Sequence, residues 1–258
     1  MFNRIPTLPD VESLVSDASA STEGFIDRLN IVDPSTYPDT LIYIWIAALA
    51  AGVGICLYTP LFRRIEIVST LAHELGHGLG GMFAGRKFRS FSLHPDASGV
   101  TSTAGAGRLG LIFCFWSGYA APGTVAVLIA IMFAAGIPSW PYILTLFVLA
   151  MTFLRARSLT TVAVLCLVGV GALGIGLSDS VELQTTVLSF LIGFFITAGI
   201  RQISDAWKQR KIDGGTADGD ALASLTFIPE SVWLILFHLY TGACATASAV
   251  LLTSVNWG

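Results

Sequence analysis

The sequence predicts an all-α polytopic membrane protein with about six spanning helices. Of its 258 residues, 54% are hydrophobic and only 12% are charged, and long apolar runs recur along the chain. A soluble domain carries about twice that share of charged residues, and about 20 apolar residues are enough for a helix to cross a bilayer. A multi-pass protein of the cell membrane, in contact with the lipid bilayer, is therefore expected. The net charge of -3 predicts no nucleic-acid partner.

Residues 1–40 are expected to form an acidic extramembrane tail, because they hold seven acidic residues, two basic residues and four prolines. Residues 41–258 are expected to form a membrane-embedded domain. Basic residues follow the first apolar run and recur at 155–157 and 201–211, which places these turns in the cytoplasm by the positive-inside rule. The longest of these connections is a cytoplasmic loop at about 201–226. The six expected spans are 41–59, 109–135, 142–154, 159–177, 183–200 and 231–255.

The segment 86–107 differs from the spans, since it is rich in Ser, Thr and Gly and has few long aliphatic residues. Phe91 and Leu93 alternate with polar residues, the stretch 94–99 contains turn formers, and Thr101 and Thr103 resume the alternation. The sequence therefore predicts a re-entrant β-hairpin. Such backbone is tolerated at membrane depth only where protein buries it or where it lines a wet cavity.

An H-E-x-x-H motif, His73-Glu74-x-x-His77, precedes this hairpin in an otherwise apolar stretch. On a helix, two histidines four residues apart project from one face, about 6 Å apart, and can share one tetrahedral Zn²⁺ ion. Glu74 lies beside the first ligand, where it can deprotonate a water molecule as the general base. A chance cluster is the alternative. However, ionised groups cost about 2.5–3.5 kcal/mol at the centre of a membrane helix, so three such residues within five positions need a function.

A catalytic zinc site needs a third protein ligand, and we expect Asp220 to supply it. This aspartate precedes an apolar segment that leads into the last span, although a helix N-cap is the alternative role. Three nearby aspartates, Asp205, Asp213 and Asp218, belong to a polar, Lys/Arg-rich loop and are expected to be solvated. His94 and Asp96 are expected to be turn residues, and His238 to be a hydrogen-bonded core histidine.

Four stretches resemble the site-2 protease family of intramembrane zinc metalloproteases, in particular a bacterial branch of small polytopic members. They are A-H-E-L-G-H-G-L, S-L-H-P-D-A-S-G-V-T-S-T, S-G-Y-A-A-P-G and D-A-L-A-S-L-T-F-I-P-E-S-V-W. The resemblance implies that His73 and His77 bind zinc, that Glu74 is the general base, and that a later aspartate completes the site. In better-known members that aspartate belongs to an L-D-G sequence. Here the nearest lookalike, I-D-G-G at 212–215, lies in a polar loop, which keeps Asp220 as first choice and Asp213 as runner-up.

The expected activity is hydrolysis of peptide bonds in transmembrane protein substrates. A substrate helix must unwind first, and the hairpin can hold it as an added strand. The alternatives are a non-catalytic zinc-binding scaffold and a transporter. Few charges lie in the other helices, which disfavours a transporter. A zincin that acts on lipidated C-termini would need a second H-E-rich helix or a third glutamate ligand, and the sequence offers only one such helix.

Overall fold

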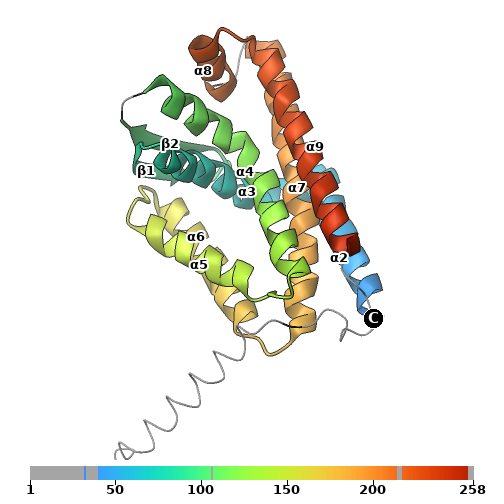
Figure 1. Ribbon diagram of the computed structural model, residues 1–258. Coiled ribbons are helices and arrows are strands. Elements are labelled where there is room, and N and C mark those ends of the chain that lie inside the picture. The colour runs from blue at the N-terminus through green and yellow to red at the C-terminus, as the bar shows by residue number, and fades with distance from the viewer. Residues whose placement is uncertain (1–31, 33–39, 106, 214–216, 255–258) are drawn as a thin grey trace, which may run out of the picture.

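The structure is a computed structural model that describes residues 32, 40–105, 107–213 and 217–254. The tail expected at 1–40 lies almost entirely outside the described residues. Within them the chain forms eight helices and one two-stranded sheet (Figure 1). In order, the elements are α2 (Thr40–Leu57), α3 (Thr59–Phe83), β1 (Lys87–Leu93), β2 (Gly99–Ala104), α4 (Arg108–Ala134), α5 (Trp140–Phe153), α6 (Leu159–Gly176), α7 (Val181–Asp213), α8 (Ala217–Thr226) and α9 (Glu230–Ser254).

Five helices, α2, α4, α6, α7 and α9, are long and apolar enough to cross a membrane. The fold class is therefore confirmed, with α5 as a shorter apolar helix of 14 residues in place of a full sixth span. Helices α2, α4, α7 and α9 pack side by side (Figure 1), and the largest core cluster lies among α2, α4 and α7. There the indole of Trp45 donates a hydrogen bond of 2.9 Å to the hydroxyl of Thr185, which satisfies a polar group in an apolar core.

Helix α3 carries the H-E-x-x-H motif and has clear signals at both ends. Pro60 lies in its first turn, where its missing N–H costs nothing. Gly85 follows its last turn with φ of 78°, and the N–H of Arg86 donates to the carbonyl of Gly81. This is the glycine-terminated helix end in which a left-handed residue lets the chain turn back sharply. The reversal leads directly into β1.

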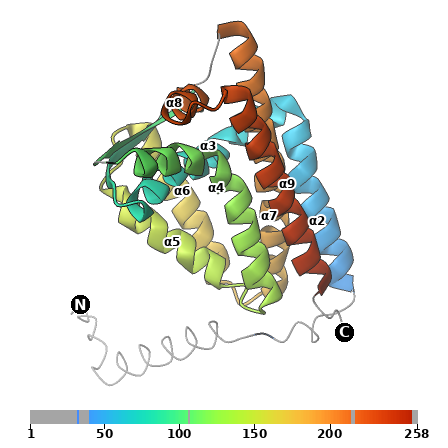
Figure 2. The ribbon, with the colours of Figure 1, turned by 45° about the horizontal axis from the view of Figure 1, so that its top comes forward.

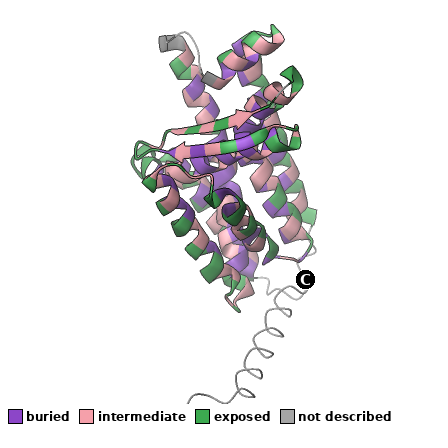
Figure 3. Cartoon of the chain, turned by 90° about the vertical axis from the view of Figure 1, so that its left-hand side faces the viewer, coloured by how far each residue is buried: buried purple, intermediate pink, exposed green. Residues whose placement is uncertain are grey.

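The predicted hairpin is confirmed. Strands β1 and β2 pair antiparallel, and their register runs from Lys87 opposite Ala104 to Leu93 opposite Gly99. The other edge of β1 contacts the α5–α6 turn, because Phe91 exchanges backbone hydrogen bonds with Arg155 and Arg157. Figure 3 shows the hairpin lying across the helices, with buried and exposed residues alternating along β1. Its aromatic residues therefore anchor it to the helical core.

The connection expected as a loop at 201–226 is largely helical. Helix α7 continues to Asp213, and α8 begins at Ala217. The polar end of α7 is helical because its charges pair along one face: Asp205 lies 2.7 Å from Lys208 and 3.9 Å from Arg201. Helix α8 contacts both α4 and α9, and Figure 2 shows it at the end of the bundle near α3 and α4. A short helix is thus brought over the middle of the motif helix.

Candidate metal centre

Three side chains from two segments far apart in the sequence, α3 and α8, meet where α8 packs on the helix bundle. The Nε2 atoms of His73 and His77 are 3.0 Å apart, and the Oδ2 atom of Asp218 lies 3.1 Å from each. The three side chains are between 9% and 17% exposed. Each of the three offers one atom that can bind a metal, and within the described residues they form a group that could hold one metal ion.

The third member of this group is Asp218, whereas the sequence favoured Asp220. These residues are two positions apart on α8, which rotates one from the other by about 200° around the helix. When Asp218 faces the histidines, Asp220 must face away, and its side chain is indeed exposed. The expectation that Asp218 is solvated is wrong, since only 17% of its side chain is exposed. Asp213 ends α7, and its side chain lies outside the described residues.

The electrostatics of the group favour a bound cation. Burial on its own raises the pKa of Asp218, but hydrogen bonding to the rings of His73 and His77 outweighs burial and leaves this pKa below its ordinary value. The Nδ1 atom of His77 lies 2.8 Å from the carbonyl oxygen of Cys114, which can only accept, so Nδ1 carries the proton. His77 can therefore donate from Nε2 to Asp218 only when its ring is protonated, and in the neutral ring the lone pair of Nε2 faces the anionic carboxylate. Two such acceptors need a proton or a cation between them.

The donor set also fits zinc in its chemistry and spacing. Two imidazole nitrogens and one carboxylate oxygen are ligands that Zn²⁺ accepts, and in a tetrahedral site such atoms lie roughly 3.4 Å apart. The observed separations of 3.0–3.1 Å are a few tenths of an ångström shorter. The hydrogen bond from His77 to the backbone of Cys114 is the outer contact that fixes a ligating ring in place. Small movements of the side chains would therefore accommodate the ion.

Helix α4 approaches the two histidines so closely that any side chain at position 118 would displace their rings. A methyl group built on Gly118 would lie 2.4 Å from Nε2 of His77 and 3.0 Å from Nε2 of His73. Gly76 of α3 faces the same helix, since a methyl group there would lie 2.5 Å from the carbonyl oxygen of Ser117. The stretch S-G-Y-A-A-P-G is thus a wall of the site, and its Tyr119 ring packs edge-on against His73 at 4.8 Å.

Glu74 lies where the motif helix meets the hairpin. Its side chain is buried, and a methyl group built on Gly99 would lie 2.7 Å from its Oε1 atom. Two hydroxyl groups fasten the hairpin to this part of α3: Thr101 donates to the carbonyl of Glu74 at 3.0 Å, and Thr70 donates to the carbonyl of Ala97 at 2.9 Å. The start of β2 therefore covers the carboxylate without a side chain of its own.

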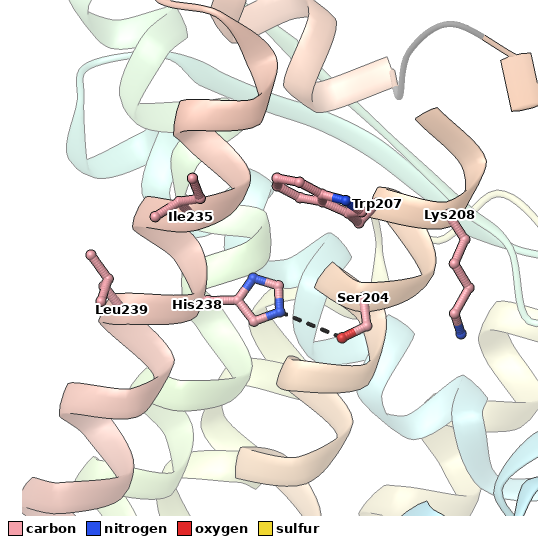
Figure 4. A pocket seen from close by; sticks show the side chains of 6 residues that line it. All are labelled: Ser204, Trp207, Lys208, Ile235, His238 and Leu239. Atoms are coloured by element: carbon pink, nitrogen blue, oxygen red, sulfur yellow. Dashed lines mark hydrogen bonds between the residues drawn. The ribbon is translucent and has the colours of Figure 1, made fainter. Parts of the chain in front are cut away.

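The other sequence candidates do not join the group. Asp96 accepts two hydrogen bonds from Ser98, through its N–H and its hydroxyl, and His94 is exposed in the same turn, so both are turn residues as predicted. His238 lies in a groove between α7 and α9 (Figure 4). Its Nδ1 atom is 2.9 Å from the carbonyl of Leu234, and its Nε2 atom is 3.4 Å from the hydroxyl of Ser204.

One signal in the sequence pointed to Asp218. The family resemblance implies an aspartate followed by glycine, and the chain contains two such pairs, Asp213-Gly214 and Asp218-Gly219. The second pair directly precedes Asp220 in the stretch A-D-G-D-A-L-A. If this stretch is read as the start of a helix, Asp218 and Leu222 are four residues apart and lie on the same face. Because Leu222 is buried, that face turns away from solvent, and Asp218 with it.

One comparison with known proteins identifies the family of the chain. The family model described as Peptidase M50B-like matches residues 45–248, which include both histidines, the hairpin and Asp218. No curated protein and no solved structure matches the chain significantly. Peptidases of family M50 are generally zinc metalloproteases. The chain therefore belongs to the Peptidase M50B-like family, within the site-2 protease family that its motifs resemble.

Proposed function

We propose that this protein is an intramembrane zinc metalloendopeptidase that hydrolyses peptide bonds of membrane-embedded protein substrates. The observation that carries the proposal is the meeting of His73, His77 and Asp218 within 3.1 Å, next to the buried Glu74. These three residues would hold the zinc ion. When bound, zinc supplies Lewis acidity, which polarises a carbonyl and lowers the pKa of water towards about 7.

Glu74 is the general base of this reaction. Its carboxylate takes a proton from water while the water oxygen bonds to the carbonyl carbon of the scissile peptide. The same proton then passes to the amide nitrogen as the C–N bond breaks, which releases an amine and a carboxylic acid that ionises by losing the second proton of the water. Burial of Glu74 under Gly99 supports this role, since a base shielded from bulk solvent keeps its proton for the leaving group.

The hairpin offers a place for the unwound substrate. One edge of β1 pairs with β2, and its other edge contacts the α5–α6 turn. Within the described residues, no strand pairs with the outer edge of β2. An extended substrate can add to such an edge through backbone hydrogen bonds. Strand β2 begins at Gly99, beside Glu74, so an added strand would run towards the base. Cleavage of a membrane substrate by a variant that lacks residues 88–104 would contradict this role of the hairpin.

The test combines zinc content with cleavage of a transmembrane substrate in detergent or in vesicles. We expect about one zinc ion per chain in the wild type, in Asp220→Ala and in Glu74→Gln. We expect little zinc in His73→Ala and Asp218→Ala, because each has lost a ligand. Glu74→Gln keeps the shape of the side chain but cannot accept the proton, so its cleavage rate should fall about 10²- to 10⁴-fold.

Two outcomes would overturn the proposal. A wild-type protein that holds no zinc after purification in zinc-containing buffer would exclude the metal site. A Glu74→Gln variant that binds zinc and cleaves at the wild-type rate would exclude Glu74 as the base. Zinc binding without cleavage of any membrane substrate would favour the non-catalytic scaffold.

A further inference from the structure

A basic pocket of about 430 Å³ lies where the end of α3, strand β1 and the end of α5 meet. It takes no part in the proposed reaction. Four of its lining residues are cationic, and the other two are apolar. The lining residues are Met82, Arg86, Lys87, Phe88, Arg89 and Arg155.

Two of the four cations are held in fixed positions by neutral groups. Arg86 donates hydrogen bonds to the hydroxyl of Thr103 and to the carbonyl of Gly105, which tie the two ends of the hairpin together. Arg155 donates to the carbonyl of Phe88 and lies over the Phe88 ring, 5.5 Å from its centroid, a distance typical of a cation–π pair. Carbonyls, a hydroxyl and a ring orient these guanidinium groups but leave their charge uncompensated.

The other two cations, Lys87 and Arg89, are exposed on β1. Within the described residues, no ion pair joins any of the four cations to a carboxylate. Charges of one sign that gather without a counter-charge repel one another, and an anion bound among them relieves that repulsion. The composition of the pocket therefore calls for an anionic ligand.

The surroundings of the pocket point to a lipid as the source of that anion. Met82 lines the pocket, and the next residue, Phe83, is 87% exposed at the end of α3. An apolar surface beside clustered basic residues matches a phospholipid, whose phosphate lies at the membrane surface and whose acyl chains extend from it into the apolar core. We propose that this pocket binds the phosphate headgroup of an anionic phospholipid, with the acyl chains against Met82 and Phe83.

Such a lipid would also strengthen the hairpin. Its headgroup would bridge Lys87 and Arg89 of β1 and Arg155 of the α5–α6 turn, two segments already joined through Phe91. The hairpin in turn contacts Glu74 through Thr101 and Gly99. Lipid bound in this pocket would thus stabilise the segment that covers the metal centre. The proposal concerns binding, and it stands independently of the proposed protease activity.

The test measures the affinity of the full-length protein, purified in a neutral detergent, for short-chain phosphatidylglycerol. Short-chain phosphatidylcholine and inorganic phosphate are the comparison probes. The Lys87→Gln/Arg89→Gln variant removes the two exposed charges and leaves Arg86 and Arg155 in place. The matched control is Arg63→Gln/Arg64→Gln, which removes two exposed arginines from the other end of α3.

We expect phosphatidylglycerol to bind the wild type more tightly than phosphatidylcholine does. Its affinity should fall about 25-fold in the pocket variant, about fivefold for each basic residue lost, and less than about twofold in the control. The circular dichroism spectrum and the thermal unfolding midpoint should remain unchanged in both variants, which shows that they are folded whether or not zinc is bound. An equal loss of affinity for phosphatidylglycerol in both variants would overturn the proposal, because it would show that the lipid responds only to the net charge of the surface. Binding of inorganic phosphate as tightly as phosphatidylglycerol, or no preference for the anionic lipid, would overturn the lipid assignment.

Discussion

The two histidines and the aspartate of the metal centre are positioned in different ways. His73 and His77 belong to one helix of 25 residues, and the close contact of α3 with α4 at Gly76 and Gly118 limits how far their rings can move. Asp218 belongs to a helix of only ten residues. Its position depends on tertiary contacts made by a few of its neighbours. One half of the site is therefore built into the core, and the other half is delivered by a docked segment.

The contacts that dock α8 are few and can be named. Leu222 is fully buried in a cluster with Tyr119 and Phe237. Arg108, at the start of α4, donates a hydrogen bond to the carbonyl of Leu225 in the last turn of α8 and lies over the ring of Phe227. A cation at the C-terminal end of a helix also interacts favourably with the helix dipole. This comparison predicts that the two halves of the site will respond differently to mutation.

The largest effect is expected at the rigid half. In Gly118→Ala, the added methyl group would lie 2.4 Å from Nε2 of His77, so the ring has to move. A ring can swing aside without unfolding the helix pair, but its nitrogen then leaves the metal position. We expect zinc affinity to fall by at least about 100-fold, more than the loss of an outer contact causes, with little change in secondary structure.

Gly242→Ala is the matched control, because nothing lies within 4 Å of a methyl group built there. It should bind zinc as the wild type does. Wild-type zinc affinity in Gly118→Ala, measured by competition with a chelator, would show that α4 does not constrain the histidines.

A smaller effect is expected at the docked half. Leu222→Ala removes a fully buried side chain that holds α8 against α4 and α9, and such changes typically cost about 2–5 kcal/mol. Part of that cost falls on the docking of Asp218, so zinc should bind about tenfold more weakly while His73 and His77 stay in place. Ser224→Ala, at an exposed position of the same helix, is the control. A Leu222→Ala variant that loses stability but keeps its full zinc affinity would indicate that Asp218 is held by other contacts.

The smallest effect is expected where the hairpin meets α3. Thr101→Val keeps the branched shape of the side chain but removes the hydrogen bond to the carbonyl of Glu74. A hydrogen bond of this kind contributes about 1 kcal/mol to stability, so the thermal unfolding midpoint should fall by a few degrees. The exposed Ser102→Ala is expected to unfold at the wild-type temperature. Equal midpoints for Thr101→Val and wild type would mean that this bond does not anchor the hairpin.

The sequence predicted the parts of the molecule that depend on local patterns. The spacing of His73 and His77 places them on one face of any helix, and the turn formers at 94–99 lie where β1 gives way to β2. Spans of 18 or more apolar residues were equally clear. These features follow from the helical period, from turn chemistry and from the cost of polar groups in lipid.

The third residue of the candidate metal centre was harder to predict, because it depends on which face of α8 turns inward. Asp218 and Asp220 both lie near the start of α8, and the glycine after Asp218 is the one local signal that separates them. The docking of Leu222 against α4 and α9 decides which of the two faces the histidines. The stretch S-G-Y-A-A-P-G is typical of a kinked or closely packed helix. The sequence could not show what packs against Gly118, because the two histidines lie on a helix more than 40 residues away. Tertiary packing, and not propensity, decides both features.

The most direct test of the proposed site is X-ray absorption spectroscopy at the zinc edge, on wild type, Asp218→Cys and Asp220→Cys. The account predicts only nitrogen and oxygen neighbours at about 2.0–2.1 Å in the wild type. Asp218→Cys should add one sulfur neighbour at about 2.3 Å, because the thiolate replaces the carboxylate as ligand, and Asp220→Cys should give the wild-type spectrum. A sulfur signal from Asp220→Cys, with none from Asp218→Cys, would contradict the site described here.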